Sequence, residues 1–319
     1  MIETKGLTKR YGALTALDDL TLSIGAGEVF GFIGPNGAGK TTTMKILSCL
    51  MKPDAGTASV AGFSIRSQSD DVRRRIGYMP DFLGVYDDLT VDEYLQFFAS
   101  AFGIPRKQRP AVVGQVLELT DLTAKRHAMV DSLSRGMQQR LGVARVLVHD
   151  PQVLLLDEPA SGLDPRARIE MRGLLTELGR MGKTLIVSSH ILSELGEMCS
   201  SIGIIERGRL LYAGSVADAF ARTRALASTG ERVVITLEGG DACASAGAVA
   251  GRLALDARVS SAKGDDAERR VTVSLVPGEH GHHFLIESVI AAGGRIAAFQ
   301  PEQVRLEDAF LKLTTGALQ

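Results

Sequence analysis

The sequence predicts an α/β fold for roughly the first two thirds of the chain, followed by a small α+β domain. Three observations support this prediction. From residue 1 to about 215, short apolar runs alternate with helix-like stretches, which is the pattern of an α/β domain. The apolar run at 28–33 leads directly into a glycine-rich turn. After about residue 222 the linker-like stretch 225–230 interrupts the alternation, and a different succession of elements follows.

Composition and charge narrow the class of protein. Of the 319 residues, 45% are apolar, which allows two domains with buried cores. The formal net charge is −1 and no strongly basic tract stands out, so we do not expect nucleic acid as a partner. The three scattered cysteines fit a reduced, cytosolic protein. The sequence lacks a secretory signal and an uninterrupted apolar run of about 18 to 20 residues, so any work at a membrane requires a partner there.

The elements of the first domain, which we place at 1–222, follow from its apolar patterns. Residues 87 to about 150 are predicted to form a helical subdomain. Within it, Thr90 and Glu93 have the spacing of a capping box at a helix start, and Pro151 is expected to end the last helix. The runs predicted to be buried strands of a mainly parallel sheet are 28–33, 153–156, 185–187 and 202–205.

The second domain, which we place at 230–319, has an alternation of its own. Its expected order is strand, helix, strand, strand, helix, strand, which would suit a small ferredoxin-like unit. A closing helix is predicted at 306–313. The strands are predicted at 232–237, 257–262, 270–276 and 295–299, and the helices at 242–255 and 283–292.

The turn after the first buried strand has the Walker A pattern, glycine, four residues, then Gly-Lys-Thr. Glycines let backbone N–H groups turn inward around a phosphate, and the next helix directs the positive end of its dipole at the same anion. In such loops the lysine reaches the β- and γ-phosphates and the threonine hydroxyl ligates Mg²⁺. The sequence therefore predicts ATP and Mg²⁺ as cofactors, bound by Gly34, Pro35, Asn36, Gly37, Ala38, Gly39, Lys40, Thr41 and Thr42.

The apolar strand at 153–156 ends in two carboxylates, Asp157 and Glu158. At the carboxyl end of a buried parallel strand, such residues face the crevice where ligands of open α/β sheets bind. Asp157 suits the Walker B role of holding Mg²⁺, directly or through water. Glu158 can orient and polarise the water that attacks the γ-phosphate. A solvated strand end is the alternative, and the Walker A motif upstream disfavours it.

Just before this strand lies the segment 133–140, which reads Leu-Ser-Arg-Gly-Met-Gln-Gln-Arg. A serine N-cap and a glycine at a helix start form an anion-binding helix terminus, although Leu-Ser-x-Gly alone would be only a cap. In this position it closely resembles the signature motif of the ATP-binding cassette family, Leu-Ser-Gly-Gly-Gln. The resemblance implies that Ser134 and Gly136 contact the γ-phosphate of an ATP held by the other subunit of a dimer.

Other positions match the same family in the expected order, over residues 1 to about 220. Tyr11 resembles the aromatic residue that stacks on adenine. Residues 161–164 resemble the D-loop, which links the two sites across a dimer and adds Asp164 to the nucleotide-binding set. His190 resembles the switch histidine that contacts the γ-phosphate. The predicted catalytic residues are therefore Lys40, Glu158 and His190.

Two motifs depart from the family pattern. Arg135 replaces the first glycine after the signature serine and Met137 replaces the usual glutamine, which we interpret as a feature of an exporter subtype. Asp81 stands where the family has the Q-loop glutamine, which touches Mg²⁺ and faces the membrane partner. Aspartate is also a hard oxygen ligand, although it is shorter and charged. The predicted metal ligands are therefore Thr41, Asp81 and Asp157.

The tail at 304–311 resembles the C-terminal extension of ATPases that serve exporters of drugs, antibiotics, polysaccharides or lipids; it also fits an ordinary amphipathic helix. These resemblances imply an ATP-hydrolysing subunit that forms a homodimer and drives a separate integral membrane permease. It would then work at the cytoplasmic face of the cell membrane. Export as the direction of transport is likewise what the resemblance implies.

Two alternatives have different consequences. A cassette protein that acts on ribosomes or DNA is disfavoured, because the chain has one visible nucleotide domain and no long coiled coil between Lys40 and Asp157. A regulatory module that holds ATP but hardly hydrolyses it stays open, because of Asp81 and the altered signature. Glu158 and His190 argue against it.

Overall fold

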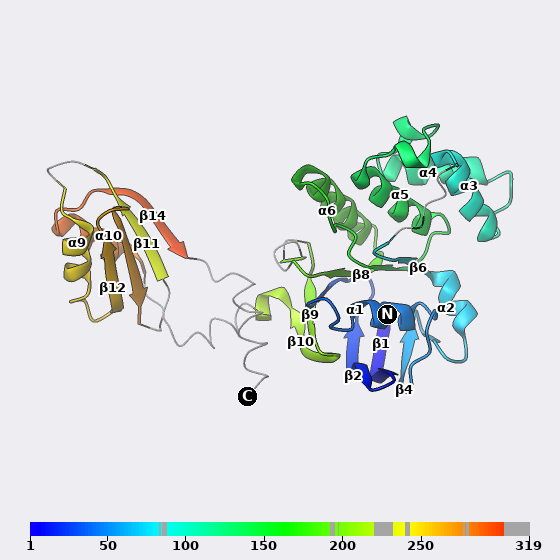
Figure 1. The fold of residues 1–319 in the computed structure, drawn as a ribbon, viewed down its shortest axis with the longest axis horizontal. Helices are drawn as coiled ribbons and strands as arrows, with labels where there is room; N and C mark the ends of the chain where they lie inside the picture. The colour runs from blue at the N-terminus through cyan, green and yellow to red at the C-terminus, as the bar shows by residue number, and fades with distance from the viewer. Residues whose placement is uncertain are drawn as a thin grey trace. The chain divides into compact units, whose positions relative to one another are not determined.

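The computed structural model describes residues 1–82, 84, 88–191, 195–196, 198–219, 232–239, 243–276, 278 and 281–302. The chain divides into two compact units, the first running from Met1 to Ala219 and the second following it (Figure 1). The predicted linker at 225–230 and the predicted closing helix at 306–313 lie outside the described residues.

The first unit contains a six-stranded sheet that carries the predicted buried strands. From β9 to β6 neighbouring strands are parallel, and β10 pairs with β9 in the antiparallel direction. The prediction of a mainly parallel sheet is confirmed, and the strand at 153–156 has the predicted bounds. In sheet order the strands are β10 (Arg209–Ser215), β9 (Ser201–Glu206), β3 (Val29–Ile33), β8 (Thr184–Ser189), β7 (Val153–Leu156) and β6 (Ile76–Met79).

A second, antiparallel sheet of the first unit was not predicted from the sequence. Its strands alternate between buried and exposed side chains, because only one face meets the core. This alternation is interrupted by register shifts between β1 and β2, which weakens the period-2 signal along the chain. In sheet order the strands are β2 (Leu14–Ile24), β1 (Ile2–Tyr11), β4 (Ala55–Val60) and β5 (Phe63–Ser64).

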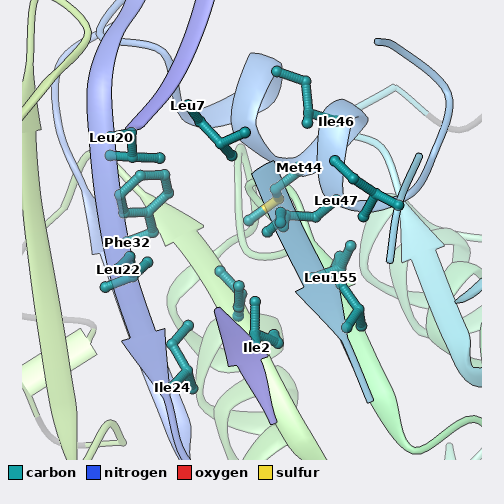
Figure 2. Close-up of a cluster of buried hydrophobic side chains, with 14 of the residues drawn as sticks. Ile2, Leu7, Leu20, Leu22, Ile24, Phe32, Met44, Ile46, Leu47 and Leu155 are labelled. Atoms are coloured by element: carbon teal, nitrogen blue, oxygen red, sulfur yellow. The ribbon is translucent and has the colours of Figure 1, made fainter. Parts of the chain in front are cut away.

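Helix α1 (Lys40–Leu47) lies between the two sheets and joins them into one core. Figure 2 shows Met44 and Leu47 of α1 near Leu155 of the parallel sheet, with Leu20 and Leu22 of the antiparallel sheet in the same cluster. Burying these apolar side chains stabilises the unit by about 25 cal/mol per Å² removed from water. The core therefore fixes the helix that begins at the glycine-rich turn.

The predicted helical segment contains α3 (Val91–Ala101), α4 (Arg109–Leu119) and α5 (Arg135–Leu147). The capping box is confirmed, because Thr90 Oγ1 accepts from Glu93 N and the Glu93 carboxylate accepts from Thr90 N. Helix α5 ends before Pro151, as expected. Helix α6 (Pro165–Arg180) follows β7, and α2 (Ser69–Arg75) precedes β6. Helices α5 and α6 lie on the side of the six-stranded sheet opposite α1 (Figure 1).

The second unit has the element order strand, helix, strand, strand, helix, strand. Its antiparallel sheet has the order β12-β13-β11-β14, and α9 and α10 pack on it through one apolar core. Helix α9 is shorter than the predicted helix 242–255, because Ser245 caps its start and its last residue is Leu253. The elements are β11 (Arg232–Leu237), α9 (Ala246–Leu253), β12 (Val259–Asp265), β13 (Arg270–Leu275), α10 (His283–Ala291) and β14 (Ile296–Glu302).

Within the described ranges of both units, none of the helices combines the length and the apolar character that crossing a bilayer would require.

Leu155→Ala is expected to lower the free energy of unfolding of the first unit by about 2–5 kcal/mol, because it leaves a cavity in a closely packed core. Leu155 is 0% exposed, whereas the control position Leu50 is 65% exposed; Leu50→Ala should change stability by less than about 0.5 kcal/mol. Urea unfolding followed by circular dichroism measures both, since the chain contains no tryptophan. Equal effects of the two substitutions would contradict this account of the core.

Candidate functional site

The glycine-rich turn joins the end of β3 to the start of α1. Ala38 N donates to Pro35 O at 3.1 Å, which closes the turn, and Gly39 caps α1 with φ 111°, a backbone conformation that favours glycine. Pro35, Asn36 and Gly37 are exposed, while Gly34, Ala38 and Gly39 are buried. The turn therefore presents an open rim of backbone at the positive end of the α1 dipole.

Lys40 is held under this turn by its own loop. Its side chain is 6% exposed, and Nζ donates to Gly34 O at 2.6 Å and to Pro35 O at 3.3 Å. Glu158 Oε1 lies 3.4 Å from the same Nζ. Thr41 is exposed at the next position and Thr42 is half-buried. The structure thus places a buried cation and a hydroxyl group at the start of α1.

Asp157 and Glu158 follow β7, and the neighbouring strand β8 supplies a serine that contacts both. Ser188 Oγ donates to Asp157 Oδ1 at 2.6 Å and accepts from Glu158 N at 2.9 Å. Asp157 is 1% exposed. Ser188 was not among the predicted site residues. It could have been found from the sequence as a hydroxyl residue within the apolar run before His190.

Glu158 contacts the other two predicted catalytic residues, Lys40 and His190. It adopts a left-handed backbone conformation with φ 51°, which is uncommon for a long side chain and is often found at functional sites. Its Oε1 faces Lys40, and its Oε2 accepts a hydrogen bond from Nδ1 of His190 at 2.9 Å. The structure therefore brings Lys40, Glu158 and His190 together from three separate elements.

Asp81, two residues after β6, is electrostatically coupled to this group. Burial first, and then the charges of Asp157 and Glu158, raise the pKa of the Asp81 carboxyl group, while Arg135 and His190 act in the opposite direction. A cation at this position would remove the repulsion among the three carboxylates.

The signature segment and the D-loop contact each other. Ser134 caps α5 by accepting from Met137 N at 3.3 Å, and a Cβ on Gly136 would lie 2.8 Å from Ala167 Cβ in α6. Asp164 caps α6, accepting from Ala167 N at 2.9 Å. Ser134, Gly136 and Asp164 therefore mark the starts of two packed helices on the side of the sheet opposite α1 (Figure 1).

Tyr11 lies at the end of β1 and is 46% exposed. Its hydroxyl donates to Met51 Sδ at 2.9 Å, and Lys9 Nζ lies 5.8 Å from its ring centroid. These contacts connect Tyr11 to the segment after α1. They leave part of the ring open for stacking, which is the chemistry expected of it.

The donor atoms at the strand ends fit a hard divalent cation. Asp157 Oδ2 is buried and makes no hydrogen bond within the described part of the chain, which is costly for a carboxylate oxygen unless a ligand uses it. Thr41 offers a hydroxyl oxygen and Asp81 a further carboxylate. Oxygen donors of this kind are those that Mg²⁺ prefers. A buried lysine, a glycine-rich turn and these oxygens can together bind a polyphosphate with its cation.

Comparisons with known proteins find similar sequences and similar structures. A family model described as "ABC transporter" matches residues 17–161, and one described as "AAA domain, putative AbiEii toxin, Type IV TA system" matches residues 129–196. The chain is similar to a Nod factor export ATP-binding protein I of Burkholderia orbicola, with 42% identity over 67% of this chain and 70% of the relative. It is also similar to a bacitracin transport ATP-binding protein of Bacillus licheniformis, with 41% identity over 66% of this chain and 68% of the relative.

Solved structures show the same similarity. An ATP binding subunit of an ABC transporter superposes with a TM-score of 0.63 at 30% identity, covering 70% of this chain and 92% of that one. A dimeric ATP-binding cassette in a post-hydrolysis state, bound to ADP and Pi, superposes with a TM-score of 0.62 at 26% identity, covering 68% of this chain and 99% of that one.

Gly34→Ala is expected to destabilise the first unit by about 1–3 kcal/mol and to weaken ATP binding, because the site is overpacked. A Cβ at this position would lie 2.3 Å from Ile205 O and 3.0 Å from Ala38 Cβ. Gly173→Ala is the control, since a Cβ there meets nothing within 4 Å and a helical alanine should stabilise by about 0.5–1 kcal/mol. Thermal unfolding and ATP titration measure both effects. An unchanged Gly34→Ala protein would contradict the packing described for the turn.

Asp81→Gln is expected to raise the thermal midpoint of the nucleotide-free protein at neutral pH. Because the folded-state pKa of Asp81 lies above the usual value of 3.8, the ionised carboxylate destabilises the fold above that raised pKa, and the penalty disappears as the pH falls below the unfolded value. The gain should therefore shrink as the pH is lowered towards about 4.

Asp54→Asn provides a control of opposite sign. A hydrogen bond from Arg10 N, followed by one from Lys9, lowers the pKa of Asp54, so its ionised form stabilises the fold at neutral pH and this substitution should lower the midpoint. Thermal scans across the pH range test both variants. A gain for Asp81→Gln that grows on acidification would be inconsistent with the raised pKa.

Proposed function

The chain belongs to the ABC transporter family as an ATP-binding and ATP-hydrolysing subunit of the exporter type, and we propose that it powers a separate membrane permease as one half of a homodimer. The observation that carries this proposal is the contact of Glu158 with Lys40 on one side and with His190 on the other. This contact places Lys40, which would bind phosphate, beside Glu158, a carboxylate that can act on water.

Each site in this dimer would combine residues of two copies. Lys40, Thr41, Asp157 and Glu158 would come from one copy, and Ser134 and Gly136 from its partner. The first four gather at the α1 face and the strand ends, whereas the start of α5 packs against α6 on the other side of the sheet. A helix N-terminus can bind phosphate, and we propose that the start of α5 binds the nucleotide of a second copy.

We assign the steps of ATP hydrolysis as follows. Lys40 exchanges its loop carbonyls for phosphate oxygens and neutralises their charge. Glu158 orients and polarises the attacking water, and His190 fixes the carboxylate through Oε2. Thr41, Asp157 and Asp81 would hold Mg²⁺, which when bound neutralises charge that develops on the phosphates. Asn36 and Gly37 of the exposed turn would offer their N–H groups to the phosphates, and Tyr11 would stack on the adenine.

The permease would meet the helical segment 87–140 and the loop at Asp81. Large apolar side chains are exposed in this part of the chain: Phe82 is 84% exposed, Phe97 49% and Phe102 45%. Exposed aromatic residues of this kind are typical anchors of protein interfaces. Docking there would hold the protein at the cytoplasmic face of the cell membrane. The relatives' names concern Nod factor export and bacitracin transport, and we propose a drug, an antibiotic or a lipid as the cargo.

The test is ATP turnover by the purified full chain with Mg²⁺. Glu158→Gln is expected to bind ATP while its turnover falls by about 10²-fold or more, and the ATP-bound dimer should accumulate in size-exclusion chromatography. The control is Glu177→Gln, an exposed carboxylate paired with Arg180 at 3.5 Å, which should hydrolyse ATP normally. Equal turnover by Glu158→Gln and the wild type would remove Glu158 from the reaction. An ATP-bound Glu158→Gln protein that stays monomeric would contradict the dimer.

A further inference from the structure

A buried tyrosine hydroxyl belongs to β6, the strand that pairs with β7 before its acidic end. Tyr78 belongs to β6, and the parallel register pairs it with Leu155 of β7. Its ring packs against the core cluster that contains Leu155 and α1, so its side chain leaves the sheet on the α1 face. Tyr78 Oη is shielded from solvent and makes no hydrogen bond among the described residues. Buried hydroxyl groups seldom lack a partner.

A second unpartnered polar atom lies on the same face of the next strand. Asp157 follows Leu155 by two residues, and Asp157 N donates to Met79 O at 2.8 Å, which extends the pairing of β6 and β7 by one residue. Strand alternation then directs the Asp157 side chain to the face that Tyr78 occupies. Ser188 occupies only Oδ1 of Asp157, and Oδ2 has no partner in the described residues.

The two groups also interact electrostatically. Burial, followed by the negative charges of Asp157 and Asp81, raises the pKa of Tyr78 to about 12. The hydroxyl therefore keeps its hydrogen at neutral pH and remains a hydrogen-bond donor. The ring fills core volume that a phenylalanine would fill equally well, so packing alone does not require the hydroxyl.

We propose that Tyr78 is a positioning residue of the Mg²⁺ site, whose hydroxyl would hydrogen-bond to Asp157 Oδ2 through a water held by the cation. This inference rests on the proposed role of Asp157 as a metal ligand. Hydrogen bonds of this kind fix the orientation of ligating carboxylates, and Mg²⁺ usually keeps several of its waters. The hydroxyl then orients Asp157 only when Mg²⁺ and nucleotide are bound, and it does not stabilise the nucleotide-free protein.

The experiment compares the full-length wild type with Tyr78→Phe. Binding of a non-hydrolysable ATP analogue is measured by calorimetry with Mg²⁺ and with EDTA, and the ratio of the two dissociation constants gives the gain due to the cation. The thermal midpoint of the nucleotide-free protein is measured in parallel. Tyr212→Phe is the matched control, because the Tyr212 hydroxyl donates to Ser215 O at 2.8 Å in strand β10, at the other edge of the same sheet.

Tyr78→Phe is expected to reduce the Mg²⁺-dependent gain by about three- to tenfold, without changing binding in EDTA and without lowering the thermal midpoint. Tyr212→Phe should lower the midpoint and keep the gain. The proposal is overturned if Tyr78→Phe keeps the full gain, weakens binding equally in EDTA, or lowers the midpoint as the control does. Asp157→Asn separates the two levels of inference: if it also keeps the full gain, the assignment of Asp157 to the metal is wrong as well.

Discussion

One buried hydroxyl, Ser188 Oγ, holds the acidic strand end in place. It donates to Asp157 Oδ1 and accepts from Glu158 N, so the side chain of one residue and the backbone of the next are both fixed from strand β8. The Glu158 side chain contacts Lys40 and His190 from a backbone in the left-handed region. Without the hydrogen bond from Glu158 N to Ser188 Oγ, we expect the Glu158 backbone to relax to a more favourable conformation.

The parallel sheet brings Glu158 within reach of Lys40 and His190. Strands β3, β8 and β7 are neighbours with parallel register, so their carboxyl ends meet at one edge, where the glycine-rich turn, His190 and the acidic pair come together. Helix α1 is anchored beneath that edge by core residues of both sheets. A rigid base of this kind lets an exposed turn keep its shape without a ligand.

Charge is distributed unevenly across this edge. Asp81, Asp157 and Glu158 act on one another, and Lys40, His190 and Arg135 oppose them. Arg135 also lies over the D-loop, since a Cβ on Gly162 would come 2.4 Å from its guanidinium carbon. Arg135, one of the two residues that depart from the signature pattern, therefore contacts the D-loop and acts on Asp81, which departs from the Q-loop pattern. A substitution at Arg135 or Asp81 would change the same electrostatic balance.

The sequence alone predicts the type of site and most of the elements that carry it. The glycine-rich turn, the apolar run before Asp157 and the cap at Thr90 are local patterns, because each depends on residues a few positions apart. The tertiary structure alone decided the partners of those residues. Ser188 in β8 and Tyr78 in β6 each lie on a strand next to β7, but they are about 30 and 80 positions away along the chain from Asp157. The antiparallel sheet likewise pairs β1 with β4, which are more than 50 positions apart at Ile2 and Val60. Hydrogen bonds and strand pairings between distant segments leave no periodic signal in the sequence, so only the packed fold shows which polar atoms are satisfied and which remain free to bind a ligand.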